Sequence, residues 1–208
     1  MALDKTLQLI VAQASAAGAP DLAALPVEGA RALYRQILAA ADVTPADVSV
    51  ESETIEGAGG PMPVRIYRPR RELPQGVVVY YHGGGFVLGD LDGYDNVCRQ
   101  LCEDSGATIV SVGYRLAPEY PYPAAVEDAW AGLEWAAGHL ATLAPGRARL
   151  AVAGDSAGAL LAAVMCMRAR DRGGPTVAFQ GLVYPPAAAG TVGAGASGPP
   201  SSVAVLIA

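Results

Sequence analysis

The stretch Leu150-Ala-Val-Ala-Gly-Asp-Ser-Ala-Gly158 decides the fold. Its first four residues are apolar and predict a buried strand, and the small residues after Gly158 begin a helical pattern. A G-x-S-x-G sequence between a strand and a helix places its serine on a sharp turn, with the Ser156 hydroxyl at the carboxyl edge of a sheet. We expect glycine at 154 and 158 because a side chain there would collide with the neighbouring strand and helix. The N-terminus of the helix carries free amides, so the Ala157 N–H suits a developing oxyanion.

Apolar runs alternate with helical stretches on both sides of this turn. Strands are expected at 77–81, 107–114, 149–153 and 177–184, and helices at 95–104, 125–139 and 156–170. The runs are continuous and β-branched, which is typical of strands covered on both faces, and the alternation indicates a parallel sheet with right-handed crossovers. Before them, alternating apolar residues on either side of a turn at 57–60 predict an antiparallel hairpin. Amphipathic helices near 3–14 and 33–38 open the chain.

The composition is that of a compact acidic chain. It has 208 residues, of which 52% are hydrophobic and 16% charged, and a net charge of −6. These values exclude a disordered chain, and the acidic balance offers nothing to a phosphate backbone, so we expect no nucleic-acid partner. The best apolar segment, 157–167, is shorter than the roughly 20 residues of a membrane span. We therefore expect no membrane span. Asp4 and Lys5 stand where a signal peptide needs a basic start and then an uninterrupted apolar stretch, so we expect no export signal and a cytoplasmic protein.

Three cysteines, Cys98, Cys102 and Cys166, lie in segments predicted to be helical. An odd number of cysteines in such segments indicates reduced, packed thiols rather than a disulfide framework. Cys98 and Cys102 share a helix face, but no histidine nearby completes a set of metal ligands. We therefore expect these cysteines to be small core residues and not a metal site.

A second motif, His82-Gly83-Gly84-Gly85, follows the predicted buried strand at 77–81. Three glycines in succession let backbone amides approach a substrate oxygen with no Cβ in the way. The alternatives are a flexible turn or a nucleotide-binding loop. A dinucleotide fingerprint would need glycine at position 88, where Leu88 stands, and the chain holds no P-loop sequence. His82 precedes the glycines, which favours a structural hydrogen bond over a role as general base.

Three motifs together resemble the hormone-sensitive-lipase family of α/β-hydrolase esterases. They span 82–86, 114–119 with 123–125, and 154–158. The likeness runs from about residue 3 to about residue 184. It implies an α/β-hydrolase fold with an incomplete, mostly parallel sheet, an antiparallel N-terminal hairpin, and a cap made by the opening helices.

The resemblance also implies the site and the reaction. Ser156 would be the nucleophile, and the oxyanion hole would be built from His82, Gly83, Gly84 and Ala157, with amides from the last three. The substrate would be a small ester and no cofactor would be needed. Asp155 is the family's usual neighbour of the nucleophile and receives no catalytic step of its own.

The chain departs from the family in its catalytic triad. An α/β-hydrolase triad follows the order Ser, Asp or Glu, then His. After Ser156 the sequence has no histidine and a single acid, Asp171, and both of its histidines, His82 and His139, precede the serine. His139 could act only in a triad of another chain order, and its place at a helix end favours a capping role. A serine without a base loses on the order of a millionfold in turnover, so we expect ester hydrolysis to be severely impaired.

Three segments are predicted: a helical cap over 1–45, a partial α/β-hydrolase core over 46–186, and a disordered tail over 187–208. No charged residue follows Arg172, and the tail is dominated by Ala, Gly, Ser and Pro. We favour an esterase whose C-terminal part is absent through truncation or a shifted reading frame, which would leave the strand at 177–184 with an unpaired edge. The alternatives are a non-catalytic ligand-binding module, or a subunit that borrows Asp and His from another chain.

Overall fold

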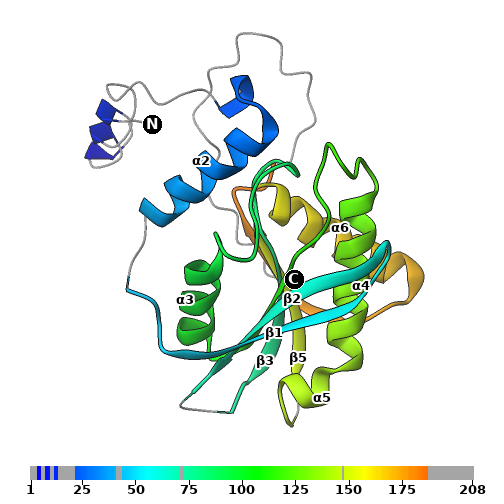
Figure 1. The fold of residues 1–208 in the computed structure, drawn as a ribbon. Coiled ribbons are helices and arrows are strands. Elements are labelled where there is room, and N and C mark those ends of the chain that lie inside the picture. Colours follow the sequence, from blue (N-terminus) through cyan, green and yellow to red (C-terminus); the bar gives the residue numbers. More distant parts are fainter. Residues whose placement is uncertain are drawn as a thin grey trace.

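The computed structural model describes residues 4–5, 8–9, 12–13, 22–40, 44–70, 73–146 and 148–186. Within them, one sheet lies between helices on both of its faces (Figure 1). The strands are β1 (Val48–Gly57), β2 (Gly60–Pro69), β3 (Gly76–Tyr81), β4 (Thr108–Val112), β5 (Arg149–Asp155) and β6 (Val177–Val183). The helices are η1 (Leu22–Ala24), α2 (Val27–Ala40), α3 (Asp95–Ser105), α4 (Ala124–Gly138), α5 (Leu140–Leu143) and α6 (Ala157–Arg172).

The sheet has the order β1-β2-β4-β3-β5-β6. The pairs β4–β3, β3–β5 and β5–β6 are parallel. β1 and β2 form an antiparallel hairpin that closes with Gly57 opposite Gly60, and β2 runs antiparallel to β4. This arrangement confirms the predicted α/β class, with a mostly parallel sheet and an N-terminal antiparallel hairpin. Every strand and helix predicted between 48 and 184 is present, and the short α5 is the one helix of that region without a prediction.

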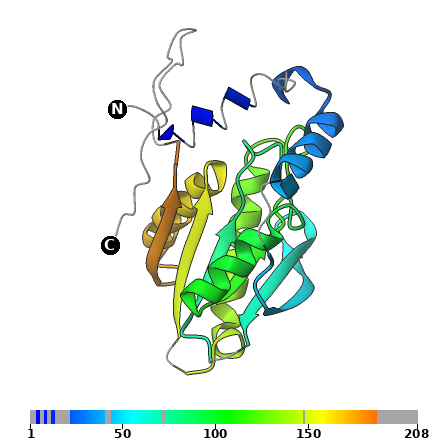
Figure 2. The same cartoon turned by 90° about the vertical axis from the view of Figure 1, so that its left-hand side faces the viewer.

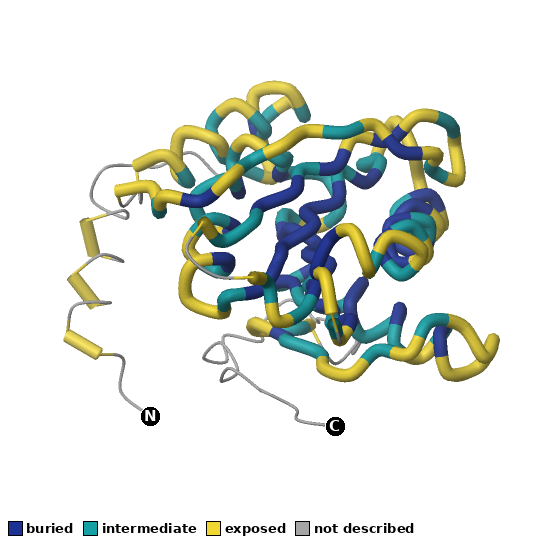
Figure 3. The backbone as a smooth tube through the Cα atoms, turned by 90° about the horizontal axis from the view of Figure 1, so that it is seen from below, coloured by how far each residue is buried: buried dark blue, intermediate teal, exposed yellow. Residues whose placement is uncertain are grey.

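The core lies in two layers, one on each face of the sheet (Figure 2). On one face, α3 buries Cys98 and Cys102 against Tyr67, Tyr80 and Ile109. On the other, α4 and α6 bury Leu133, Leu161 and Met165 against Val79 and Val110. The dark, buried backbone therefore runs through the central strands, and the exposed residues form the outer shell (Figure 3). Burial on both faces is the physical reason why the central strands are continuously apolar.

β6 is the edge strand of the described sheet. Among the described residues it pairs only with β5, and Leu182 is its one buried residue. Phe179 and Val183 are 40% and 39% exposed. The expected unpaired edge is thus present in the described part of the chain. β6 is not buried on both faces, unlike the central strands.

The predicted cap is described only in part. α2 confirms the second predicted helix, and its Tyr34 and Leu38 pack against the core on the α3 side of the sheet. The apolar positions of the first predicted helix, Leu3, Leu7, Ile10, Val11 and Ala14, lie outside the described residues, as does the whole tail over 187–208. The division at residue 45 remains a prediction. No helix in the described ranges combines the length and apolar character needed to cross a bilayer.

Candidate active site

The strand order has a topological switch point at β3, because the connections that follow β3 and β4 lead to opposite sides of it. From β3 it passes through α3 to β4 on one side, and from β4 it passes through α4 to β5 on the other side. In open α/β sheets, ligands bind in the crevice that such a switch opens at the carboxyl ends of the strands. The loop after β3 carries His82 and the glycines, and the turn after β5 carries Ser156. The register places Tyr81 beside Gly154, so the fold brings the two sequence motifs together at this crevice.

Ser156 occupies the sharp turn between β5 and α6. Its backbone has φ 50° and ψ −117°, a conformation that L residues rarely adopt and that persists only where the surrounding structure enforces it. The Ser156 N–H donates to the Val183 carbonyl at 2.9 Å, which ties the turn to the end of β6. The main-chain amides of the first turn of α6 start immediately after the serine.

The glycines on either side of Ser156 are required by contacts between main chains. A Cβ on Gly158 would lie 1.9 Å from the Tyr81 carbonyl oxygen, at the end of β3. A Cβ on Gly154 would lie 2.4 Å from the Gly158 carbonyl carbon. A side chain at either position would therefore collide with main-chain atoms, as predicted. Without side chains at 154 and 158, α6 can begin directly against the end of β3, which places the serine in the crevice.

The glycine-rich loop differs from the expectation at one position. The Gly83 N–H donates to Asp155 Oδ1 at 2.9 Å, so this amide is engaged and does not point freely at a ligand. Gly84 has φ +119° and its carbonyl accepts hydrogen bonds from Val87 and Leu88. No hydrogen bond among the described residues uses the N–H of Gly84 or Gly85. Gly85 was absent from the predicted set, although its place as the third glycine of the motif was visible in the sequence.

Asp155 is the centre of a hydrogen-bond cluster that the sequence did not reveal. Asp155 is buried, with only 6% of the residue exposed. Oδ1 accepts from Tyr80 at 2.8 Å and from Gly83, and Oδ2 accepts from Tyr94 at 3.0 Å and Tyr184 at 3.1 Å. Burial, and then the Asp155 charge, raise the pKa of Tyr184 to about 12. The tyrosines are far apart in sequence, so no local pattern could have indicated the cluster.

Comparisons with known proteins agree with this geometry. A sequence model described as alpha/beta hydrolase fold matches residues 78–202. Esterase LipI of Mycobacterium tuberculosis is 52% identical over 144 residues, which cover 67% of this chain and 44% of LipI. Carboxylesterase NlhH of that species is 48% identical over 163 residues, covering 76% of this chain and 50% of NlhH. A solved hyperthermophilic esterase from Pyrobaculum calidifontis has a TM-score of 0.80 at 45% identity, covering 89% and 59% of the two chains. This chain belongs to the α/β-hydrolase family.

Within the α/β hydrolases, these relatives confirm the predicted resemblance to hormone-sensitive-lipase-like esterases. The chain spans about half the length of the curated relatives that it matches.

The two histidines of this hydrolase are both engaged away from the serine. The His82 ring is buried and stacks on Tyr114, with ring centroids 4.4 Å apart. Its Nδ1–H donates to the Gly83 carbonyl at 2.8 Å, and the Tyr114 hydroxyl donates to the His82 carbonyl at 2.7 Å. Burial lowers the pKa of His82, which keeps the ring neutral. His82 thus supports the loop, as its place before the glycines predicted.

His139 lies at the other end of β5 from Ser156. It follows α4 and is exposed, and its Nδ1 donates to the Trp135 carbonyl at 2.8 Å. Its ring stacks on Trp135 with centroids 4.6 Å apart. These contacts agree with the predicted capping role. The described residues hold no group of three side chains able to ligate a metal.

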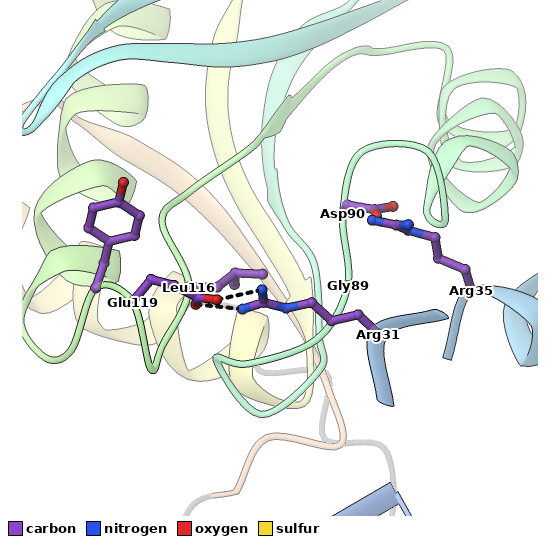
Figure 4. Close-up of a pocket in the computed structure, with 7 residues that line it drawn as sticks. Arg31, Arg35, Gly89, Asp90, Leu116 and Glu119 are labelled. Carbon is purple, nitrogen blue, oxygen red and sulfur yellow. Dashed lines mark hydrogen bonds and ion pairs between the residues drawn. The ribbon is translucent and has the colours of Figure 1, made fainter. Parts of the chain in front are cut away.

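Arg31 attaches α2 to the loops after β3 and β4 (Figure 4). Its Nη1 and Nη2 donate to the Glu119 carboxylate, each at 2.8 Å. The same guanidinium donates to the carbonyls of Val87 at 2.9 Å and Ala117 at 3.1 Å. The hydrogen bond from Arg31 lowers the pKa of Glu119 to about 2. A cavity of about 370 Å³ lies beside this pair.

Two further residues on the same face of α2 continue the attachment. Tyr34 and Arg35 follow Arg31 by three and four residues, so all three side chains share one face of the helix. Tyr34 and Tyr94 are hydrogen-bonded through their hydroxyls at 2.9 Å. Arg35 forms an ion pair with Asp90. α2 therefore contacts both the glycine-rich loop and the cluster around Asp155.

The buried tyrosines predict that the hydrolase unfolds in alkali. Burial raises the pKa of Tyr67, Tyr80, Tyr81, Tyr94 and Tyr114. Above a pH of about 10, the folded state therefore keeps phenolic protons that the unfolded chain releases. The free energy of unfolding is independent of these groups below that pH and falls as the pH rises above it. Above that pH, each of these buried hydroxyls lowers the free energy of unfolding by about 1.4 kcal/mol per pH unit. We expect tyrosinate absorbance and loss of circular dichroism to appear together in one transition. Tyrosinate absorbance from these residues in a chain that stays folded would contradict this.

Proposed function

We propose that the crevice between β3 and β5 is a site of carboxylic ester hydrolysis, with Ser156 as the nucleophile and a small ester as the substrate. The observation that carries the proposal is the turn at Ser156, whose φ of 50° places a serine at the start of α6 and beside the glycine-rich loop. The relatives named as esterase and carboxylesterase support the same reaction class.

The proposed reaction has two halves. The Ser156 Oγ attacks the ester carbonyl carbon, the bond from that carbon to the alcohol oxygen breaks, and the alcohol leaves with a proton. Water then attacks the acyl group on Ser156, which releases the carboxylic acid and restores the hydroxyl. We assign the oxyanion to the amides of Ala157, Gly84 and Gly85, because the Gly83 amide is bound to Asp155. Each such donor is worth about 3 kcal/mol in a dry site.

We further propose that the polypeptide of 208 residues performs only the first half, and slowly, when it is alone. Its two imidazoles belong to His82 and His139, and the contacts of both rings leave Ser156 without a base among the described residues. The oxyanion donors still favour attack, by roughly a thousandfold over water. An activated ester should therefore acylate Ser156 and remain there.

Acylation by a nitrophenyl ester of a short acid tests this proposal. Peptide mass spectrometry should find the acyl group on Ser156, formed roughly a thousandfold faster than on a surface serine because of the oxyanion donors. Ser49 and Ser52 are exposed and serve as internal controls. The Ser156→Ala variant should carry no label in the peptide that spans residue 156. Binding of the ester without acylation of Ser156 would favour a non-catalytic binding module instead.

We also retain the cytoplasm as the proposed compartment. The support is that Cys98, Cys102 and Cys166 are all free thiols, as reducing compartments keep them. Fluorescence microscopy of a tagged chain checks this location.

A further inference from the structure

We infer that Asp155 is a positioning residue, which holds the glycine-rich loop so that the Gly84 and Gly85 amides point into the crevice. The inference deepens the proposed function and rests on it. It assigns a task to a side chain beside the nucleophile that takes no step in the reaction.

The first argument is the direct contact between the carboxylate and the loop. Oδ1 of Asp155 accepts the Gly83 N–H at 2.9 Å, and a Cβ on Gly83 would lie 2.2 Å from Oδ2. The carboxylate therefore lies directly against the Gly83 main chain. A hydrogen bond to an ionised acceptor is stronger than one between neutral groups, so it fixes the peptide that precedes the two free amides.

The second argument is that the carboxylate is buried without a cation. No ion pair among the described residues involves Asp155, and its oxygens are satisfied by four neutral donors. Burying a charge in this way is costly, and an apolar side chain would fill the same space more cheaply. Among the described residues, Gly83 is the one main-chain donor to this carboxylate, which favours a task at the loop over a packing role.

The third argument is the number of elements that fix the carboxylate. Tyr80 comes from β3, Tyr94 precedes α3, and Tyr184 follows β6. Tyr94 is also hydrogen-bonded to Tyr34 of α2. The position of the carboxylate is thus set by residues of β3, of the segment before α3 and of the segment after β6, and through Tyr94 by α2. A change at any of these tyrosines should reach the loop through Asp155.

Neighbouring tyrosines on β3 provide a matched pair of variants. The Tyr80 hydroxyl donates to Asp155 at 2.8 Å, whereas the Tyr81 hydroxyl donates to the Ala129 carbonyl of α4 at 2.9 Å. Both rings are buried on opposite faces of the sheet. Tyr80→Phe and Tyr81→Phe each remove one buried hydroxyl, but only the first removes a contact of Asp155.

The test combines amide NMR with the acylation assay on the full chain. In Asp155→Ala we expect the Gly84 and Gly85 amide resonances to shift and Ser156 acylation to fall by roughly tenfold to a hundredfold, because misdirected oxyanion donors lose their effect. Asp155→Asn keeps an oxygen acceptor for Gly83, so it should restore most of the rate. Tyr80→Phe should shift the same resonances by a smaller amount. Tyr81→Phe should leave them in place.

The outcomes separate this inference from the proposed function. If Asp155→Ala folds and the Gly84 and Gly85 resonances stay at their wild-type positions, the inference is wrong whatever the acylation rate. If Asp155→Ala does not fold, unchanged Gly84 and Gly85 resonances in Tyr80→Phe overturn the inference. If the resonances move as expected but the wild-type chain never acylates Ser156, the positioning role stands and the proposed function fails.

Discussion

Gly158→Ala is expected to abolish stable folding of the hydrolase. The new Cβ would lie 1.9 Å from the Tyr81 carbonyl oxygen and 2.6 Å from that of His82. Both atoms belong to main chain that is held in the sheet or buried beside it, so neither can move away without breaking the start of α6 from the end of β3. Clashes with rigid main chain exceed the usual cost of overpacking, and we expect a loss of at least about 4 kcal/mol in the free energy of unfolding. Denaturant unfolding followed by circular dichroism measures it.

Gly138→Ala is the matched control for this substitution. Gly138 is the last residue of α4, and a Cβ there would meet nothing within 4 Å. Alanine favours the helix by up to about 1 kcal/mol over glycine, so this variant should be as stable as the parent or more so. A Gly158→Ala chain that unfolds at the parent's denaturant concentration would show that α6 does not pack on β3 as described.

The second large effect concerns turnover. The chain of 208 residues and its Ser156→Ala variant are expected to hydrolyse a short nitrophenyl ester at the same steady-state rate. Removal of the base from a serine hydrolase costs on the order of a millionfold in turnover, because both attack by the serine and release of the acyl group need a proton acceptor. Release of nitrophenol should therefore stop after at most one equivalent. Absorbance measured over many equivalents of substrate distinguishes this from catalysis.

Turnover that depends on Ser156 would contradict the proposal that Ser156 has no base among the described residues. His139→Asn and His82→Asn would then identify the acceptor. The His139 ring is exposed, stacks on Trp135 and donates to the Trp135 carbonyl, so its variant should fold normally and identify the acceptor more clearly than the buried His82. Loss of turnover in His139→Asn would mean that the ring reaches a serine at the opposite end of β5.

The sequence predicted the elements of this fold but not the network that joins them. Ser156, Gly154 and Gly158 were placed correctly because a strand, a tight turn and a helix follow one another within a few residues, so the required geometry is local. The cluster around Asp155 could not be predicted in this way, because the donors to its carboxylate are spread from Tyr80 to Tyr184. The engagement of the Gly83 amide was missed for the same reason: its acceptor is distant in sequence and adjacent only through the pairing of β3 with β5.

Strand β3 gives the molecule two faces that can be engineered separately. The face beneath α4 and α6 carries the Tyr81 side chain, which packs in the core and donates to the Ala129 carbonyl, so side-chain substitutions there should change heat resistance more than reactivity. The face that carries Tyr80 leads through one carboxylate to the groups that would contact a substrate. Variants on the first face are expected to differ mainly in thermal stability, and variants on the second face mainly in the rate of Ser156 acylation.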